Sequence, residues 1–258
     1  MTLDDFGLDA FSLEGRCALV TGGTTGLGQA MAVALARAGA DVMVAALTPD
    51  DGSTQQRVEA AGRRWRALES DVTEHGEPAR IVEACRAELG SVDILVNSAG
   101  TCLLADVEDF DREHWDPMVA VNLTAAFELS RAAAQVMRGQ GHGKIINVAS
   151  LFSFLGGRRS PAYAATKAGI AGFTRAYCDE LGEHNIQVNA IAPGYMTTAL
   201  TAATRADGQS YRRIVEHIPA GRWGDPADLM GAVVFLAGRA SDYVNGHLLV
   251  VDGGYLVR

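Results

Sequence analysis

Short apolar segments alternate along the chain with longer segments in which apolar residues recur every three or four positions. The short segments predict buried strands, because a brief apolar run bounded by glycine or polar residues is typical of the centre of a sheet. They lie at 17–20, 41–46, 65–69, 93–97, 144–148, 186–192 and 247–251. The longer segments predict helices up to Gly39 and at about 53–62, 74–89, 112–140, 161–183 and 226–238.

This alternation favours βαβ units with right-handed crossovers, and therefore a parallel sheet with helices on both faces. The predicted fold class is α/β, a single doubly wound (Rossmann-type) domain of about seven parallel strands that spans residues 1–258. Residues 1–15 are expected to form an N-terminal extension. The polar stretch 195–224 is expected to be a mobile lid over a substrate, because polar insertions beside such sites commonly close on binding.

Glycine and small polar residues follow the predicted strands. The first strand runs into 22–28, which has the spacing G-x-x-x-G-x-G, and then into a helix. Such a loop lets the backbone approach a pyrophosphate, and the helix N-terminus offers free N–H groups. Other strand ends carry Ala46-Leu47, Asp71, 97–100, Ser150 and Pro193-Gly194. Because ligands of parallel sheets bind outside this edge, the sequence predicts a site there.

Tyr163 and Lys167 begin the helix that follows Ser150. Residues four apart share one helix face, so the ammonium is expected to favour the phenolate and lower the pKa of the tyrosine. The chain has 22 basic residues, of which only Lys144 and Lys167 are lysines. An ammonium is compact, whereas a guanidinium is planar, and this chain uses arginine at almost every other basic position. The lysine four residues after Tyr163 therefore favours a catalytic pair over a common surface pair.

Composition excludes several classes of function. A net charge of −9 argues against nucleic-acid binding, which depends on cationic contacts to phosphate. The acidic start of the chain predicts no signal peptide, and no apolar run approaches the length of a membrane span, so a cytoplasmic protein is expected. The four cysteines and six histidines show no metal-ligand spacing, and no catalytic metal is expected.

Several motifs together resemble the short-chain dehydrogenase/reductase family, over essentially the whole chain and in the family's order. They are Thr21-Gly22-x-x-x-Gly26-x-Gly28, Asp71, Asn97-x-Ala99-Gly100, Asn122, Ser150, Tyr163-x-x-x-Lys167 and Pro193-Gly194-x-x-x-Thr198. Ser98 departs from the family, which more often has asparagine there. The resemblance implies a nicotinamide-dependent oxidoreductase acting on a secondary alcohol or ketone.

The resemblance also implies a role for each matching residue. Tyr163 would be the general acid/base, Lys167 would lower its pKa and bind the nicotinamide ribose, Ser150 would polarise the substrate carbonyl, and Asn122 would hold a water for a proton relay. With Tyr163 and Lys167, the cofactor-binding residues would be Gly22, Thr24, Thr25, Gly26, Leu27, Gly28, Leu47, Asp71, Val72, Asn97, Ala99, Gly100, Pro193, Gly194, Met196 and Thr198. Asp71 and Thr198 could instead be ordinary helix caps.

The end of the second strand bears on the choice between NAD and NADP. Leu47 and Thr48 supply neither the acid that binds free ribose hydroxyls nor a base, and no basic residue occurs between Arg37 and Arg57. Burying a phosphate dianion without a cation costs more than losing one hydrogen-bonding acid, so NAD is expected.

Further segments resemble one sugar-acid branch of this family, the 2-dehydro-3-deoxy-D-gluconate 5-dehydrogenases (2-deoxy-D-gluconate 3-dehydrogenases). They include Phe11-Ser-Leu-Glu-Gly15, Ala192-Pro-Gly-Tyr-Met196 and Ile218-Pro-Ala-Gly-Arg-Trp-Gly224. A sugar acid needs a cation for its carboxylate near Ser150 and Tyr163. Arg159 is the candidate and Arg158 the spare, although either could face solvent or a partner subunit.

Other functions remain open at this point. A 3-oxoacyl-thioester reductase or a gluconate 5-dehydrogenase would keep the same four catalytic residues. A nucleotide-binding protein without catalysis is a more distant alternative, because all four residues are present. The expected partner is a small-molecule substrate rather than a nucleic acid or a membrane, and family resemblance implies a homotetramer.

Overall fold

The computed structural model describes residues 6–258, and at its centre is a seven-stranded sheet. The strand order is β3-β2-β1-β4-β5-β6-β7, and every neighbouring pair is parallel. The strands are β1 (Cys17–Thr21), β2 (Asp41–Ala46), β3 (Trp65–Glu69), β4 (Ile94–Asn97), β5 (Gly143–Val148), β6 (Ile186–Pro193) and β7 (Leu248–Val251). The predicted α/β fold class with a seven-stranded parallel sheet is confirmed.

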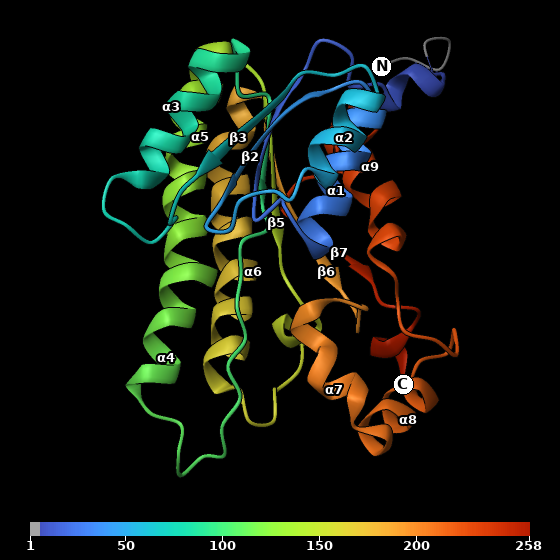
Figure 1. Ribbon diagram of the computed structural model, residues 1–258. Helices are drawn as coiled ribbons and strands as arrows, with labels where there is room; N and C mark the ends of the chain where they lie inside the picture. The colour runs from blue at the N-terminus through green and yellow to red at the C-terminus, as the bar shows by residue number, and fades with distance from the viewer. Residues whose placement is uncertain (1–5) are drawn as a thin grey trace.

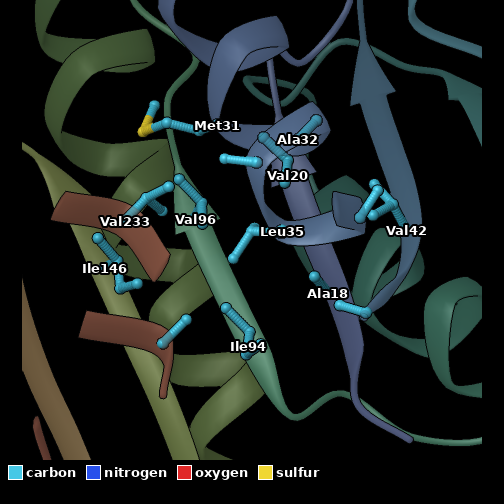
Figure 2. Close-up of a cluster of buried hydrophobic side chains, with 14 of the residues drawn as sticks. Ala18, Val20, Met31, Ala32, Leu35, Val42, Ile94, Val96, Ile146 and Val233 are labelled. Carbon is cyan, nitrogen blue, oxygen red and sulfur yellow. The ribbon is translucent and has the colours of Figure 1, made fainter. Parts of the chain in front are cut away.

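Helices cover both faces of the sheet (Figure 1). On one face lie α1 (Gly26–Arg37), α2 (Ser53–Ala60) and α9 (Met230–Ala237), and on the other α3 (Glu77–Leu89), α4 (Arg112–Val119), α5 (Ala126–Gln140) and α6 (Pro161–Leu181). Figure 2 shows the core on the first face, where Val20 and Val96 of the sheet lie near Leu35 of α1. Alternate strand residues such as Leu19 and Leu95 pack on the opposite face. Burial on both faces explains why the strands are continuous apolar runs.

The register of the sheet aligns the carboxyl ends of its central strands. Thr21 pairs with Asn97, and Asn97 pairs with Asn147. Val148 pairs with Ile191 one strand further on. The loops that follow these strands therefore emerge side by side.

The predicted helix 112–140 is interrupted by a π-helical segment, Ala120–Ala125. It follows Pro117, whose ring supplies no N–H to the helix ladder. Single π segments within α-helices occur frequently at functional sites. This one contains Asn122, which is fully buried.

Other elements also differ from the predicted ones. The stretch 195–224 contains two helices, α7 (Ala202–Ala206) and α8 (Gly208–His217), rather than irregular chain alone. The helix predicted from residue 74 begins at Glu77 after a turn, and the helix predicted from 226 begins as a 3₁₀ turn, Pro226–Leu229.

The described part of the predicted N-terminal extension packs against the sheet domain. Ala10 and Leu13 are buried, and Asp9 pairs with Arg239 at 2.6 Å. Residues 1–5 of the extension, including the acidic start considered above, lie outside the described residues. Within residues 6–258, no helix has both the length and the apolar character that crossing a membrane requires. The same residues contain no group of His, Cys, Asp or Glu side chains placed to hold a metal ion.

Candidate active site

The glycine loop between β1 and α1 lies directly against the end of β4. Gly22 has φ +65, and a Cβ there would approach Ala99 Cα at 3.0 Å. A Cβ on Gly28 would overlap the carbonyl oxygen of Gly22. The Thr21 hydroxyl accepts hydrogen bonds from the backbone N–H groups of Ser98 and Ala99, both at 3.1 Å. These contacts fix two strand ends together and require glycine in the loop.

A cavity of about 250 Å³ opens over this loop, and we call it the glycine-loop cavity. Thr25, the N-cap residue of α1, makes no side-chain hydrogen bond to the first turn of the helix. An uncapped helix N-terminus beside a glycine cradle suits a pyrophosphate, so these residues fit a dinucleotide. The predicted residues that line the cavity are Gly22, Thr25, Gly26, Leu27, Gly28, Ala99, Gly100, Tyr163, Lys167 and Thr198.

Several predicted cofactor residues do not line this cavity. Asn97 points into the protein interior, where its amide donates to Asn147 Oδ1 at 2.8 Å and to Ser130 Oγ at 2.9 Å. Through its amide nitrogen this side chain joins β4 to β5 and α5, while its buried amide oxygen has no hydrogen-bond partner among the described residues. Val72 and Met196 are core residues, and Pro193 and Gly194 line a different cavity.

The remaining three cofactor candidates lie at or near strand ends. Leu47 is exposed after β2, and Thr24 is buried, with its carbonyl accepting from Gln29 Nε2 at 3.1 Å. The Asp71 carboxylate accepts hydrogen bonds from the backbone N–H and the hydroxyl of Thr73, at 2.9 and 2.7 Å. It stabilises a turn before α3, which is close to the capping alternative raised from the sequence. Thr198 is likewise the N-cap residue of a 3₁₀ turn, Ala199–Thr201, while it also lines the glycine-loop cavity.

Tyr163 and Lys167 occupy one face of α6, as their spacing predicts. The Lys167 Nζ lies 5.5 Å from the centroid of the tyrosine ring and donates to the carbonyl oxygen of Val148 at 2.7 Å. Lys167 is only 5% exposed and has no carboxylate within 4 Å among residues 6–258. Ser150 follows β5 as the cap of the turn Leu151–Ser153 and accepts from the Phe152 N–H at 3.3 Å.

The predicted lowering of the tyrosine pKa by Lys167 is wrong for this structure. Burial raises the pKa of Tyr163 to about 12, the neighbouring Cys102 adds to the rise, and hydrogen bonding with Ser150 opposes it. Burial also lowers the pKa of Lys167 to about 8. The reason is that the ammonium is directed to the Val148 carbonyl, so desolvation of each group outweighs their mutual interaction.

Asn122 reaches the end of β4 through the π segment. Its amide oxygen accepts from the Thr101 N–H and its amide nitrogen donates to the Thr101 carbonyl, both at 2.8 Å. A longer contact of 3.5 Å joins the amide nitrogen to Thr166 Oγ1 on α6. Asn122 therefore ties the loop after β4 to the helix that carries Tyr163.

A second cavity, of about 370 Å³, lies on the other side of Tyr163. Tyr163 and Leu200 line both cavities. Ser150 and Tyr163 form part of its wall, together with the loop after β5 and residues of α7 and α8. A ligand in this second cavity could contact the phenol and the serine hydroxyl while another ligand occupies the glycine loop.

Arg159 does not line the second cavity. Its Nε pairs with Asp106 Oδ1 at 3.0 Å, so the sequence-based assignment of Arg159 as the substrate cation is not supported by its position. Arg158, the spare candidate, does line the cavity. The sequence reasoning also missed Arg213, Tyr195 and Tyr255, which line it as well. Ile214 and Ile218 are both buried and are four residues apart, as on one face of a helix. This pattern could have indicated that Arg213 lies on a helix packed against the rest of the protein.

Comparison with known proteins agrees with this geometry. A family model of short-chain dehydrogenases, described as Enoyl-(Acyl carrier protein) reductase, matches residues 22–256. The uncharacterized oxidoreductase YgcW of Escherichia coli K12 is 58% identical, covering 100% of this chain and 98% of that protein. The 2-dehydro-3-deoxy-D-gluconate 5-dehydrogenase of the same organism is 50% identical, covering 97% of this chain and 99% of that protein.

A solved structure shows the same fold. The gluconate 5-dehydrogenase of Burkholderia cenocepacia, in complex with NADP and tartrate, is 37% identical with a TM-score of 0.93. The match covers 97% of this chain and 99% of that chain.

Proposed function

The chain belongs to the short-chain dehydrogenase/reductase family of oxidoreductases, and from this premise we propose that it transfers a hydride between a nicotinamide cofactor and a secondary alcohol or ketone of a sugar acid. The observation that carries the proposal is the position of Tyr163 in the wall between two cavities, beside Ser150 and Lys167. One cavity suits a dinucleotide and the other a small polar molecule.

Each residue then has a chemical task. Tyr163 Oη gives a proton to the substrate carbonyl oxygen in reduction and accepts it from the alcohol in oxidation. Ser150 Oγ donates a hydrogen bond to the same oxygen as negative charge develops on it. Lys167 lines the glycine-loop cavity, where its ammonium would bind the nicotinamide ribose, and Asn122 holds the loop after β4 in place. The residues of the glycine-loop cavity would hold the nicotinamide cofactor, which would supply or accept the hydride when bound.

The proposed substrate class is a keto-deoxy-gluconate or a related sugar acid. Relatives named 2-dehydro-3-deoxy-D-gluconate 5-dehydrogenase are 50%, 48% and 49% identical over nearly their whole length. A fourth relative of that name is 41% identical, and relatives named for gluconate lie at 42%, 40% and 39%. The order of identity supports the keto-deoxy acid as the first substrate to test.

We propose NAD as the preferred cofactor. After Leu47, the carboxylates of Asp50 and Asp51 cap the N-terminus of α2, with Asp51 Oδ1 at 2.9 Å from the Ser53 N–H and Asp50 Oδ2 at 3.0 Å from the Gln55 N–H. Two acids occupy the helix end after β2 that a 2′-phosphate would need, and like charges repel. The contrary observation is that three similar solved structures, at 46%, 42% and 37% identity, contain NADP. Introducing a cation by Leu47→Arg is expected to shift the kcat/KM ratio toward NADPH by about tenfold.

We also propose a single catalytic domain in which 195–224 acts as a lid, a homotetrameric assembly and a cytoplasmic location. The lid proposal is supported by α7 and α8, which contribute Thr204 and Arg213 to the second cavity. Light scattering on the purified protein should give four times the chain mass of 27.2 kDa. A monomer mass would contradict the assembly and leave the catalytic proposal standing.

The decisive experiment measures initial rates with a panel of ketones. It compares keto-deoxy-gluconate, 5-keto-gluconate, 3-oxoacyl thioesters and steroid ketones, each with NADH and NADPH. Sugar acids should be reduced with a kcat/KM at least about tenfold above the other classes. Preference for acyl thioesters would overturn the sugar-acid proposal and retain the reaction class.

A further inference from the structure

The second cavity is cationic although the protein is acidic. The chain has 31 acidic and 22 basic residues. The described residues that line this cavity nevertheless include two arginines, Arg158 and Arg213, and no aspartate or glutamate. Both arginines are exposed, and a cleft lined by charges of one sign attracts ligands of the opposite sign. The lining therefore selects for an anion.

These two arginines contrast with Arg159 and Arg222 in lacking a carboxylate partner among the described residues. Among residues 6–258, neither Arg158 nor Arg213 has an Asp or Glu oxygen within 4 Å. The nearby Arg159 and Arg222 are paired, with Asp106 at 3.0 Å and Asp228 at 2.7 Å. The guanidinium groups of Arg158 and Arg213 are thus available to a ligand.

The backbone at Arg159 directs Arg158 to the cavity. Arg159 adopts a left-handed conformation, φ 65, which is uncommon for a residue other than glycine. Its carbonyl accepts from the Ala105 N–H at 3.0 Å, its side chain pairs with Asp106, and the next hydroxyl, on Ser160, donates to the Leu103 carbonyl at 3.0 Å. Three contacts therefore fasten this loop to the segment after β4 and leave Arg158 on the cavity side.

Arg213 is held at the cavity by an element that packs on an aromatic cluster. Ile214, the next residue of α8, is buried against Trp223, Tyr195 and Tyr255. Tyr211 stacks on Trp223 with an interplanar angle of 4° and a centroid separation of 5.9 Å. Because this packing seats α8, Arg213 is presented to the cavity by an element that is itself fixed.

We propose that Arg158 and Arg213 form a two-sided clamp for the carboxylate of the substrate. Ser150 and Tyr163 bind the reacting oxygen in the same cavity, so the ligand is a carboxylate whose reactive carbon stands apart from the acid group. Arginine suits this task because its fork of N–H groups matches the two carboxylate oxygens. The inference rests on the proposed function and names the residues that make the site selective for acids. Arg159 is a positioning residue that acts through Arg158.

The test compares a sugar acid with its neutral amide in four proteins: the wild type, Arg158→Gln, Arg213→Gln and the control Arg212→Gln. Arg212 is the exposed neighbour on α8 that does not line the cavity. Each clamp substitution should lower the acid-to-amide ratio of kcat/KM by roughly 10- to 100-fold, mainly through KM for the acid, because a charge-assisted pair is lost. The control should keep the wild-type ratio.

The positioning role of Arg159 has its own readout. Asp106→Asn breaks the ion pair without changing any arginine and should lower the same ratio, by less than Arg158→Gln does. A purely structural role would lower thermal stability and leave the ratio at its wild-type value.

The possible outcomes separate this inference from the proposed function. If the wild type reduces no sugar acid, both the proposed function and the carboxylate clamp are wrong. If the wild type reduces sugar acids and both Gln variants keep the wild-type ratio, the clamp is wrong and the function stands. Loss of the ratio in Arg212→Gln as well would show a general effect on α8 and would also overturn the assignment.

Discussion

The two lysines of this protein lie at opposite ends of the parallel strands and differ in their surroundings. We call the side of the sheet where the strands begin the amino edge and the side where they end the carboxyl edge. Lys144 is at the start of β5, where its Nζ donates to Asp242 Oδ1 at 2.8 Å. Lys167 lies beyond the end of the same strand and donates only to the backbone carbonyl of Val148. The pKa of both is lowered by burial, but Lys144 has a carboxylate that opposes the shift and Lys167 has none.

The difference extends to the whole of each edge. At the amino edge, the buried Asp93 accepts hydrogen bonds from the Cys17 N–H at 2.8 Å and from Ser91 Oγ at 2.6 Å, and it contacts Arg16 and His142 at 3.1 and 2.7 Å. At the carboxyl edge, polar side chains line cavities with hydrogen-bonding capacity left over. Charged groups that have hydrogen-bond or ion-pair partners within the fold stabilise it, whereas groups without such partners are available for binding or catalysis.

The largest effect that should separate the two edges is that of Tyr163→Phe. Removing the hydroxyl removes the proton donor, so kcat/KM should fall by about 10³- to 10⁴-fold. The ring contact with Phe152, at 5.8 Å between centroids, survives the substitution, and thermal stability should change little. Steady-state kinetics and a melting curve check both parts. Full turnover in the variant would remove the catalytic assignment.

The lysine pair gives the sharpest form of the comparison. Lys167→Met should lower kcat/KM by about 10²-fold or more, because the cofactor would lose the ammonium that positions its nicotinamide ribose in the glycine-loop cavity. It should also raise stability at pH 7 by up to about 3 kcal/mol, since an ammonium whose pKa is lowered from 10.5 to about 8 is costly to bury. The folded state binds fewer protons than the unfolded state between these pH values. The gain should therefore shrink as pH rises from 8 to 10.5.

Lys144→Met is the matched control for that experiment. It should retain turnover and remain within about 1 kcal/mol of the wild type, because its ion pair involves the half-exposed Asp242. Denaturation curves at several pH values measure both variants. A loss of stability in Lys167→Met, in place of the expected gain, would show that this lysine stabilises the fold.

Asp93→Asn tests the amino edge, where the buried carboxylate has hydrogen-bond partners within the fold. Burial alone would raise the pKa of Asp93, but hydrogen bonds from Ser91, Cys17, His142 and Arg16 outweigh it and hold the pKa below its usual value. The carboxylate thus contributes stability above the pKa of an unfolded aspartate, and this contribution is lost as pH falls through the lower folded value. The variant should lose about 1–3 kcal/mol at pH 7 and become less sensitive to acid, with kcat retained.

The smallest effect is expected at the exposed rim of the amino edge. Arg239→Ala breaks the pair with Asp9, whose side chains are 49% and 64% exposed. Such pairs contribute about 0–1 kcal/mol, and the loss should shrink further in high salt. A chemical denaturation series with and without salt measures it. A loss of activity here would contradict the division between the two edges.

The sequence by itself determined the sheet, its edge and the residues gathered there. Short apolar runs that alternate with helices favour central parallel strands, and parallel strands place their carboxyl ends together. Ser150, Tyr163 and the glycine loop could therefore be assigned to one site from the sequence. The spacing of Tyr163 and Lys167 likewise follows from helical geometry.

Only the tertiary structure decided which polar groups are consumed by the fold. Asn97 was assigned to the cofactor, but its amide nitrogen donates to Asn147 and Ser130 inside the protein. Arg159 was assigned to the substrate, but it forms an ion pair with Asp106. The pKa of Tyr163 is raised by burial, which depends on the elements packed around the side chain rather than on the spacing of Tyr163 and Lys167. Arg213 reaches the second cavity from 50 residues beyond Tyr163 through the packing of α8. A sequence pattern fixes which face of a strand or helix a side chain occupies, while its partners are set by contacts between elements far apart in the chain.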